Sequence, residues 1–189
     1  TSTLQQEASR KLGYSASRAM QIAQRLYEGV EIDGEVTGLI TYMRTDGIDI
    51  APEAVSEIRN TITADFGGDY LPDAPRRYTK KAANAQEAHE AIRPTSAQRL
   101  PADVARLVSA DELKLYDLIW KRTMASQMES ARVLRTSITI SSADKQTGLR
   151  GSGTVITFPG FLKLYEEGKD DTPDEKTGPP CPPSVLATH

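Results

Sequence analysis

Gly38-Leu39-Ile40-Thr41-Tyr42-Met43-Arg44-Thr45-Asp46-Gly47 is a stretch in which an apolar run gives way to a polar turn. The apolar part is typical of a strand end, and the Asp-Gly pair is typical of a loop. Just before this stretch, Asp33-Gly34 is a strong signal for a tight turn between two short strands, at 30–32 and 36–42. We therefore expect Tyr42 at the tip of a hairpin, where the strand ends and a loop begins.

Helical patterns flank this hairpin on both sides. Capping serines or threonines, each followed by a closing glycine, predict helices that end at Gly13 and Gly29. Two helices followed by a hairpin resemble a winged-helix arrangement. Further along the chain, apolar spacing and proline positions predict helices that begin at Pro52, Glu87 and Ser109, with a loop over 67–85.

The pattern changes in the last third of the chain. From Val133 onward, apolar and polar residues alternate and predict strands at 133–140, 153–158 and 161–165. Three strands leave open edges, so we expect partner strands outside this chain, or homo-oligomers that pair through those edges. Residues 166–189 are acidic and then proline-rich, which predicts a disordered linker or tail.

These patterns predict an α+β fold. We expect a mainly helical, winged-helix-like domain at 1–127, a partial antiparallel β region at 128–165, and the linker or tail at 166–189.

The composition limits the classes of protein and site. Of the 189 residues, 38% are hydrophobic and 26% charged, and no apolar stretch is long enough to span a bilayer. A single cysteine, Cys181, fits a reducing cytoplasm, and with only two histidines it argues against structural zinc. The net charge of −3 argues against a protein that coats nucleic acid by bulk electrostatics. The chain opens on Thr1 without a signal pattern, which we interpret as a cut inside a longer protein.

Tyr42 and Arg44 are the candidate chemical pair in the opening stretch. Side chains two apart on a strand share a face, so extended geometry through Met43 would point both the same way. A phenol can then attack a phosphate while a guanidinium donates to its non-bridging oxygens. A tyrosine hydroxyl has a reference pKa of about 10 and needs a nearby cation or base to react near neutral pH. Spacing alone favours the simpler interpretation that Tyr42 is a packing residue.

The residues of this stretch also resemble a motif of a known family. Residues 38–46 closely resemble the active-site signature of type IA DNA topoisomerases. Further segments resemble the same family in the same order: Thr1-Ser2-Thr3-Leu4-Gln5-Gln6-Glu7-Ala8, Ala23-Gln24-Arg25-Leu26-Tyr27-Glu28, Gln86-Glu87-Ala88-His89-Glu90-Ala91-Ile92-Arg93-Pro94-Thr95 and Leu115-Tyr116-Asp117-Leu118-Ile119-Trp120. The similarity covers residues 1 to about 165 and is greatest to the bacterial topoisomerase I branch. Topoisomerase III and reverse gyrase share the Tyr-x-Arg core.

The resemblance implies a role for each matching residue. Tyr42 would attack a phosphodiester of single-stranded DNA and form a 5′-phosphotyrosine, which is later religated so that negative supercoils relax. Arg44 would orient the scissile phosphate, and His89 would hydrogen-bond the DNA backbone or the tyrosine's phosphate. Arg93 would either contact phosphate or brace its loop. The enzyme would be an ATP-independent isomerase of the cytoplasm, associated with the nucleoid.

Other residues are weaker candidates. The arginines and lysines of a basic cluster are either a solvated loop or contacts to the DNA backbone, and a glutamine and a glutamate of the second helix would support the site: Arg76, Arg77, Lys80, Lys81, Gln24 and Glu28.

The family also uses Mg²⁺, held by an acidic cluster in an N-terminal domain that nothing here resembles. Asp46 and Asp49 are more often a solvated turn than a magnesium pair. We therefore expect no metal ligand in this chain, dependence on the rest of the same polypeptide, and no relaxation of supercoils by this part alone.

A different class of function stays open. A non-catalytic winged-helix module would place residues 15–28 in DNA as a recognition helix, but only Arg18 and Arg25 would project from it as cations. A pure packing scaffold would instead bury Tyr42 and satisfy its hydroxyl internally.

Overall fold

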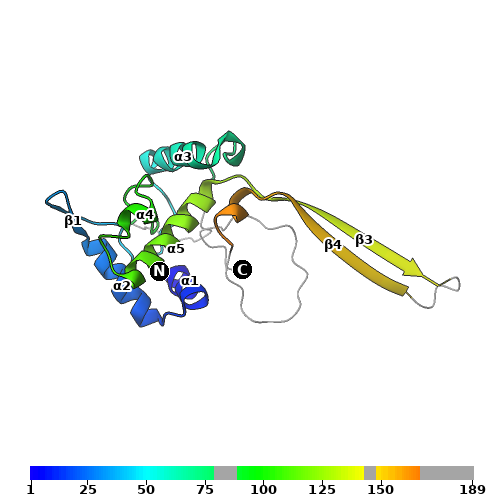
Figure 1. Cartoon of the computed structure of the whole chain (residues 1–189), viewed down its shortest axis with the longest axis horizontal. Coiled ribbons are helices and arrows are strands. Elements are labelled where there is room, and N and C mark those ends of the chain that lie inside the picture. The colour runs from blue at the N-terminus through cyan, green and yellow to red at the C-terminus, as the bar shows by residue number, and fades with distance from the viewer. Residues whose placement is uncertain (79–88, 143–147, 167–189) are drawn as a thin grey trace, which may run out of the picture.

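The first two helices form where the sequence supplies caps and glycine stops. The structure, a computed structural model, describes residues 1–78, 89–142 and 148–166; its helices form one body, from which a long hairpin extends (Figure 1). α1 (Ser2–Leu12) ends at Gly13, whose φ of 68° is left-handed. α2 (Ala16–Glu28) begins at Ser15, whose side chain accepts from the backbone N–H of Arg18 at 3.2 Å.

The first hairpin is shorter than the sequence predicts. β1 (Val30–Ile32) pairs with β2 (Glu35–Thr37) through a turn in which Asp33 and Gly34 have φ values of 54° and 85°, as the Asp-Gly signal predicts. The expected strand to Tyr42 is wrong, because β2 ends at Thr37. The backbone then leaves the hairpin to pack on α2, where Leu39 N–H donates to the Leu26 carbonyl at 2.8 Å.

α5 (Ala110–Gln127) is the central helix of the body, as Figure 1 shows. It begins with the expected capping box, in which Ser109 and Glu112 bond each other's backbone N–H. It contacts α1, α2, α4 (Pro101–Val104) and α3 (Pro52–Phe66), which is followed by the short helix η1 (Gly68–Tyr70). Its buried face makes up much of the core: Leu115, Tyr116, Leu118, Ile119, Trp120 and Met124.

The long hairpin has two strands, not three. β3 (Arg132–Ser141) pairs antiparallel with β4 (Gly148–Phe158), but the expected strand at 161–165 is wrong because η2 (Gly160–Lys163) forms there. This segment turns back onto the body, where the Tyr165 hydroxyl donates to Glu7 of α1 and accepts from Arg122 of α5 at 2.7 Å. Buried packing and these polar contacts replace a third strand pairing.

Residues 89–95 form an irregular segment that fixes the stretch after β2. Thr41 N–H donates to the Arg93 carbonyl at 2.9 Å, Ile40 and Pro94 form an antiparallel bridge, and Ala91 N–H donates to the Asp49 carbonyl at 2.8 Å. The expected helix at 87–92 is therefore wrong over 89–92, where the backbone hydrogen-bonds to another segment instead of to itself. Residues 87 and 88 lie outside the described residues.

The two segments approach closely at one glycine. A Cβ atom on Gly47 would lie 2.0 Å from the backbone oxygen of His89, so only glycine lets the loop pass there.

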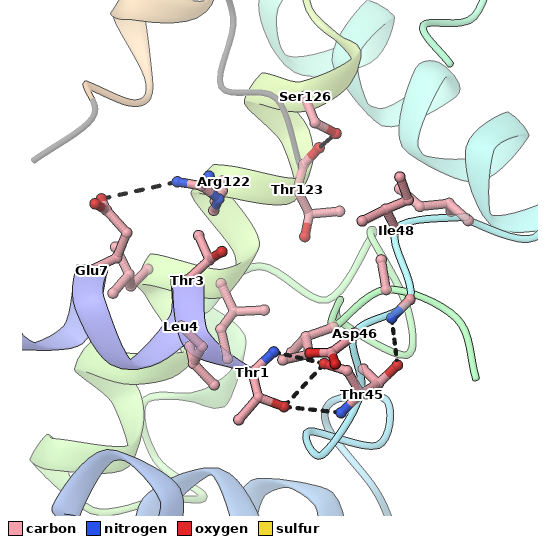
Figure 2. A pocket seen from close by; sticks show the side chains of 16 residues that line it. Thr1, Thr3, Leu4, Glu7, Thr45, Asp46, Ile48, Arg122, Thr123 and Ser126 are labelled. Atoms are coloured by element: carbon pink, nitrogen blue, oxygen red, sulfur yellow. Dashed lines mark hydrogen bonds and ion pairs between the residues drawn. The ribbon is translucent and has the colours of Figure 1, made fainter. Parts of the chain in front are cut away.

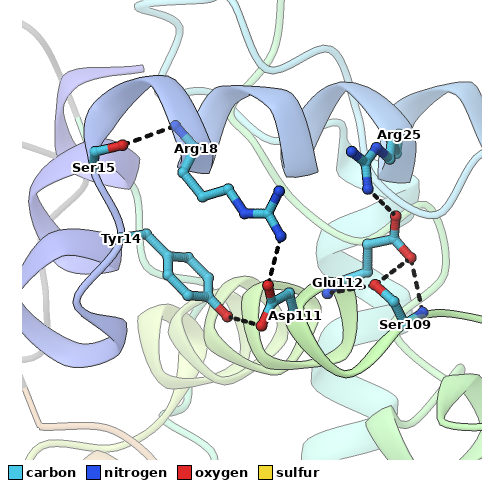
Figure 3. Close-up of polar contacts among 7 residues, drawn as sticks. All are labelled: Tyr14, Ser15, Arg18, Arg25, Ser109, Asp111 and Glu112. Atoms are coloured by element: carbon cyan, nitrogen blue, oxygen red, sulfur yellow. Dashed lines mark hydrogen bonds and ion pairs between the residues drawn. The ribbon is translucent and has the colours of Figure 1, made fainter.

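Two ion pairs join α2 to the start of α5 (Figure 3). Asp111 accepts from Arg18 at 2.7 Å and from the Tyr14 hydroxyl at 3.1 Å, and Arg25 lies 3.4 Å from a carboxylate oxygen of Glu112. Hydrogen bonds from Arg18 and Tyr14 hold the pKa of the Asp111 carboxyl below its ordinary value. These contacts fix the position of α2 along the axis of α5.

The mixed α+β class is confirmed, whereas the winged-helix detail is not confirmed. Within the described ranges, no helix is both long and apolar enough to cross a bilayer.

We expect Asp111→Asn to lower the urea midpoint of this chain at pH 7. Because the folded-state pKa of Asp111 is depressed, its stabilisation is present above its unfolded pKa and is lost as pH falls through the folded value. The difference between the variant and the native chain should therefore shrink as pH falls below about 4. Asp65→Asn, at an exposed position of α3, is the matched control; equal midpoints for Asp111→Asn and the native chain at pH 7 would contradict the prediction.

Gly47→Ala should destabilise the chain by roughly 1–3 kcal/mol, because the added methyl group forces the loop away from His89. The free energy of unfolding in urea measures this. Gly68→Ala is the control, since a Cβ there meets no atom within 4 Å. Equal stability of the two variants would show that the close approach carries no constraint.

Candidate active site

Tyr42 lies where three parts of the chain meet. Its half-buried ring lies 5.2 Å from the His89 ring, centroid to centroid, at an interplanar angle of 53°. The Tyr27 ring of α2 meets it edge-on at 5.4 Å and 66°. No hydrogen bond joins the Tyr42 hydroxyl to another residue in the described ranges, so the ring is held while the phenol oxygen stays available.

Arg44 is an exposed cation beside this ring cluster. Met43, between Tyr42 and Arg44, is fully buried, and burial therefore alternates as it does along an extended segment. The Arg44 guanidinium forms no hydrogen bond or ion pair with any residue that the structure describes. A free guanidinium can donate to two oxygens of one phosphate. The convergence of Tyr42 and Arg44 on a single phosphate stays a prediction.

The loop after Tyr42 is anchored to the start of α1 (Figure 2). The Thr1 hydroxyl donates to the Met43 carbonyl at 2.9 Å and accepts from the backbone N–H of Thr45 at 3.0 Å. The sequence predicted Ser2 or Thr3 as the cap of α1, which is wrong. Thr1 is the N-cap residue, and its side chain bonds to the loop and does not cap the helix.

A small pocket lies under the same loop. Its lining comes from α1, from residues 45–50 and from α5, and it includes Leu4, Ile48, Leu118 and Thr123 (Figure 2). Thr45 is one of its lining residues, and its hydroxyl accepts from the backbone N–H of Gly47 at 2.8 Å.

Arg93 is committed to contacts within its own segment. Its Nε and Nη2 donate to the two carboxylate oxygens of Glu90 at 2.9 and 2.8 Å, and its Nη1 donates to the Pro94 carbonyl at 2.9 Å. Its side chain is only 12% exposed. Of the two roles that the sequence left open, this geometry favours bracing of the segment that carries His89.

The two described arginines of the basic cluster, Arg76 and Arg77, differ in burial and in hydrogen bonding. Arg76 donates from Nε to the Met128 carbonyl and from Nη2 to the Ser130 hydroxyl, both at 2.8 Å, and so ties its loop to the end of α5. Arg77 is exposed. Lys80 and Lys81 lie outside the described residues.

Gln24 and Glu28, the two weaker candidates on α2, bond to each other, and their support of the site stays a prediction. Gln24 donates to Glu28 at 2.8 Å across one helical turn, on the exposed side of the helix that carries Tyr27. Tyr27 itself was missed from the sequence: it stands inside the motif that matched the family, but helical spacing gives no sign that it touches Tyr42.

Within the described residues, no group of three or more His, Cys, Asp or Glu side chains is placed to hold a metal ion. Asp46 and Asp49 follow Tyr42 in the same loop. That the metal ligands of the enzyme lie outside this chain stays a prediction.

The chain is similar to known DNA topoisomerases over most of its length. A family model described as DNA topoisomerase matches residues 1–184. DNA topoisomerase 1 of Rickettsia bellii is 53% identical over 176 residues, which are 93% of this chain and 22% of that protein. DNA topoisomerase 1 of Xylella fastidiosa (strain Temecula1) is 54% identical over 172 residues, which are 90% of this chain and 21% of that protein.

A solved structure has the same fold. Full-length topoisomerase I from Thermotoga maritima superposes with a TM-score of 0.75 and 39% identity, covering 94% of this chain and 28% of that one. The chain thus spans about a fifth of the length of the curated relatives that it matches. Sequence and structure together place this chain in the DNA topoisomerase family, among the bacterial topoisomerase I proteins.

Proposed function

We propose that this chain is the part of a type IA DNA topoisomerase that carries the nucleophilic tyrosine, Tyr42. The observation that supports this most is the ring of Tyr42, which is fixed by Tyr27 and His89 while its hydroxyl has no hydrogen-bond partner among the described residues. A nucleophile needs both a fixed position and a free reacting atom.

The reaction is a balanced exchange of one phosphodiester for another. The Tyr42 oxygen attacks phosphorus in single-stranded DNA, and the bond from phosphorus to the 3′ oxygen breaks. The phenol proton leaves, and the departing 3′ oxygen takes up a proton, so a 5′-phosphotyrosine and a free 3′ hydroxyl result. The reverse attack restores the DNA and the tyrosine. Because the bond energy is kept in the phosphotyrosine, the cycle consumes no ATP.

Arg44 and His89 are the groups that meet the phosphate in this proposal. The exposed guanidinium of Arg44 donates to the non-bridging oxygens and offsets the charge that builds up on them. His89, exposed and 5.2 Å from the Tyr42 ring, hydrogen-bonds the DNA backbone or the phosphate on Tyr42. Gln24 and Glu28 support α2 behind Tyr27. Arg77, Lys80 and Lys81 are proposed contacts to the DNA backbone.

The rest of the polypeptide must supply what this part lacks. The resemblance to the family implies that residues outside this chain bind the magnesium of the enzyme. This part alone should not relax supercoils. We place the whole enzyme in the cytoplasm with the nucleoid, where its DNA is.

The hairpin of β3 and β4 exposes apolar side chains to solvent on one face. Its pairing register puts several apolar side chains on one face, each more than half exposed: Leu134, Ile138, Ile140, Leu149 and Val155. We propose that the rest of the same polypeptide covers them and that the isolated chain otherwise pairs with a second copy. Light scattering that finds only monomers at high concentration would contradict the second half of this proposal.

The alternative of a non-catalytic DNA-binding module is less well supported. Arg18 and Arg25, the cations that its recognition helix would offer to DNA, are paired with Asp111 and Glu112 (Figure 3). A helix whose cations already face carboxylates has little charge left to anchor duplex DNA.

We expect Tyr42→Phe to abolish the covalent protein–DNA adduct without unfolding the protein, because only the attacking oxygen is removed. The test uses the complete polypeptide that carries this chain, with magnesium and an oligonucleotide labelled at its 3′ end, and a denaturing gel. Tyr70→Phe, a half-buried ring packed on Phe66 and Phe158, is the control and should leave the adduct unchanged. An adduct that persists in Tyr42→Phe removes the proposal.

Arg44→Ala should slow single-turnover cleavage by about a hundredfold, since one charge-stabilising donor group at the phosphate is removed. Arg44→Lys keeps the charge but not the forked donor and should fall between Arg44→Ala and the native enzyme. Arg106→Ala, at another exposed position, is the control. Cleavage at the native rate in Arg44→Ala would show that this arginine has no role at the phosphate.

A further inference from the structure

A second pocket opens between α3 and residues 75–78. Its volume is about 450 Å³, and Arg59, Asn60 and Arg77 are among its lining residues. The segment 48–50, which directly follows the tyrosine loop, forms another part of its wall. We propose that this pocket binds a second phosphate of the DNA strand that Tyr42 cuts. This inference rests on the proposed function, and it adds a binding site to it.

Arg59 is the residue that points to an anion. Its Nη2 donates to the Pro72 carbonyl at 2.8 Å, which holds the half-buried guanidinium in place. Its Nη1 is buried, and within the part of the chain that the structure describes it has neither a hydrogen-bond partner nor a carboxylate in an ion pair. A buried donor on a cation is costly to leave without an acceptor, and a phosphate oxygen would supply both the acceptor and the opposite charge.

The surroundings of Arg59 favour an anion over a neutral ligand. Among the described residues that line the pocket, three are arginines, at 59, 76 and 77, and one, Asp49, is a carboxylate. Arg76 offers little to a ligand, because its side chain is bonded to the Met128 carbonyl and to Ser130 and lies 3.9 Å from a carboxylate oxygen of Glu129. The donors left for a ligand are those of Arg59, of the exposed Arg77 and of the Asn60 amide. Guanidinium groups match phosphate oxygens in a forked geometry.

The position of the pocket favours DNA as the source of the phosphate. Ile48, Asp49 and Ile50 belong to its wall and follow Gly47 directly. The Asp49 carbonyl also accepts from the N–H of Ala91, two residues beyond His89, at 2.8 Å. Since residues 48–50 link the tyrosine loop to the pocket wall, a strand that crosses Tyr42 and follows this segment would reach Arg59. Arg59 then holds the strand next to the cut and fixes how far it extends beyond Tyr42.

The test is equilibrium binding of a single-stranded oligonucleotide by fluorescence anisotropy over a series of salt concentrations. It uses the complete polypeptide with Tyr42→Phe, so that no cleavage occurs. Arg59→Gln should weaken binding about tenfold, and it should reduce the slope of log K against log salt by about 0.7, the value expected when the protein neutralises one phosphate fewer on a single strand. Arg59→Lys should recover part of the affinity, and Arg106→Gln, the same charge change at an exposed position elsewhere, should change neither quantity.

Two further measurements test the proposal if Arg59→Gln does not fold. Arg77→Gln alters an exposed side chain and should reduce the slope even if Arg59→Gln impairs folding. Calorimetry with inorganic phosphate separates a DNA site from a site for a free anion. Loss of phosphate binding in Arg59→Gln with unchanged DNA affinity and slope would overturn the proposal, as would an unchanged slope in both arginine variants. These readings do not depend on whether Tyr42 is the nucleophile, which the adduct assay tests separately.

Discussion

The backbone pairing between residues 39–49 and residues 91–95 is the constraint on which the site depends. Thr41 with Arg93, Ile40 with Pro94 and Ala91 with Asp49 bring together two segments that are about fifty positions apart in sequence. Gly47 lets them approach closely enough for His89 to lie against Tyr42. Without this pairing, the phenol and the imidazole would belong to two unrelated loops. The bidentate Arg93–Glu90 pair then stiffens the second segment at its turn.

α5 sets the position of α2, which carries the second ring that contacts Tyr42. It fixes α2 through Arg18–Asp111 and Arg25–Glu112, and α2 in turn presents the edge of Tyr27 to Tyr42 (Figure 3). The same helix holds the returning end of the long hairpin through Arg122 and Tyr165. One helix therefore positions both the reactive ring and the base of the hairpin, so a movement of the hairpin relative to the body would strain contacts near the site.

Local signals were enough for the features that depend on neighbouring residues. The capping box at Ser109, the glycine stop at Gly13 and the Asp33-Gly34 turn all form as predicted, because each involves residues within a few positions of one another. The errors lie where distant segments compete with local pattern. β2 stops at Thr37, and residues 89–92 are not helical, since the backbone of each region bonds elsewhere in the fold. The residues at 161–165 pack on α5 instead of extending the sheet. Tyr27 was missed for the same reason.

The sequence could name the residues of the candidate site because they stand in short, distinctive motifs, and the roles of these residues stay predictions. Motifs name the residues, but only the structure shows which of them still have free donors, as Arg44 and Arg93 illustrate. The most direct test of the central claim is to locate the covalent bond. Trapped adduct from the complete polypeptide, digested with protease and nuclease, should yield a nucleotide 5′-phosphate on the peptide that contains Tyr42 when it is sequenced by mass spectrometry. A nucleotide found on any other residue, with Tyr42 unmodified, would contradict the account.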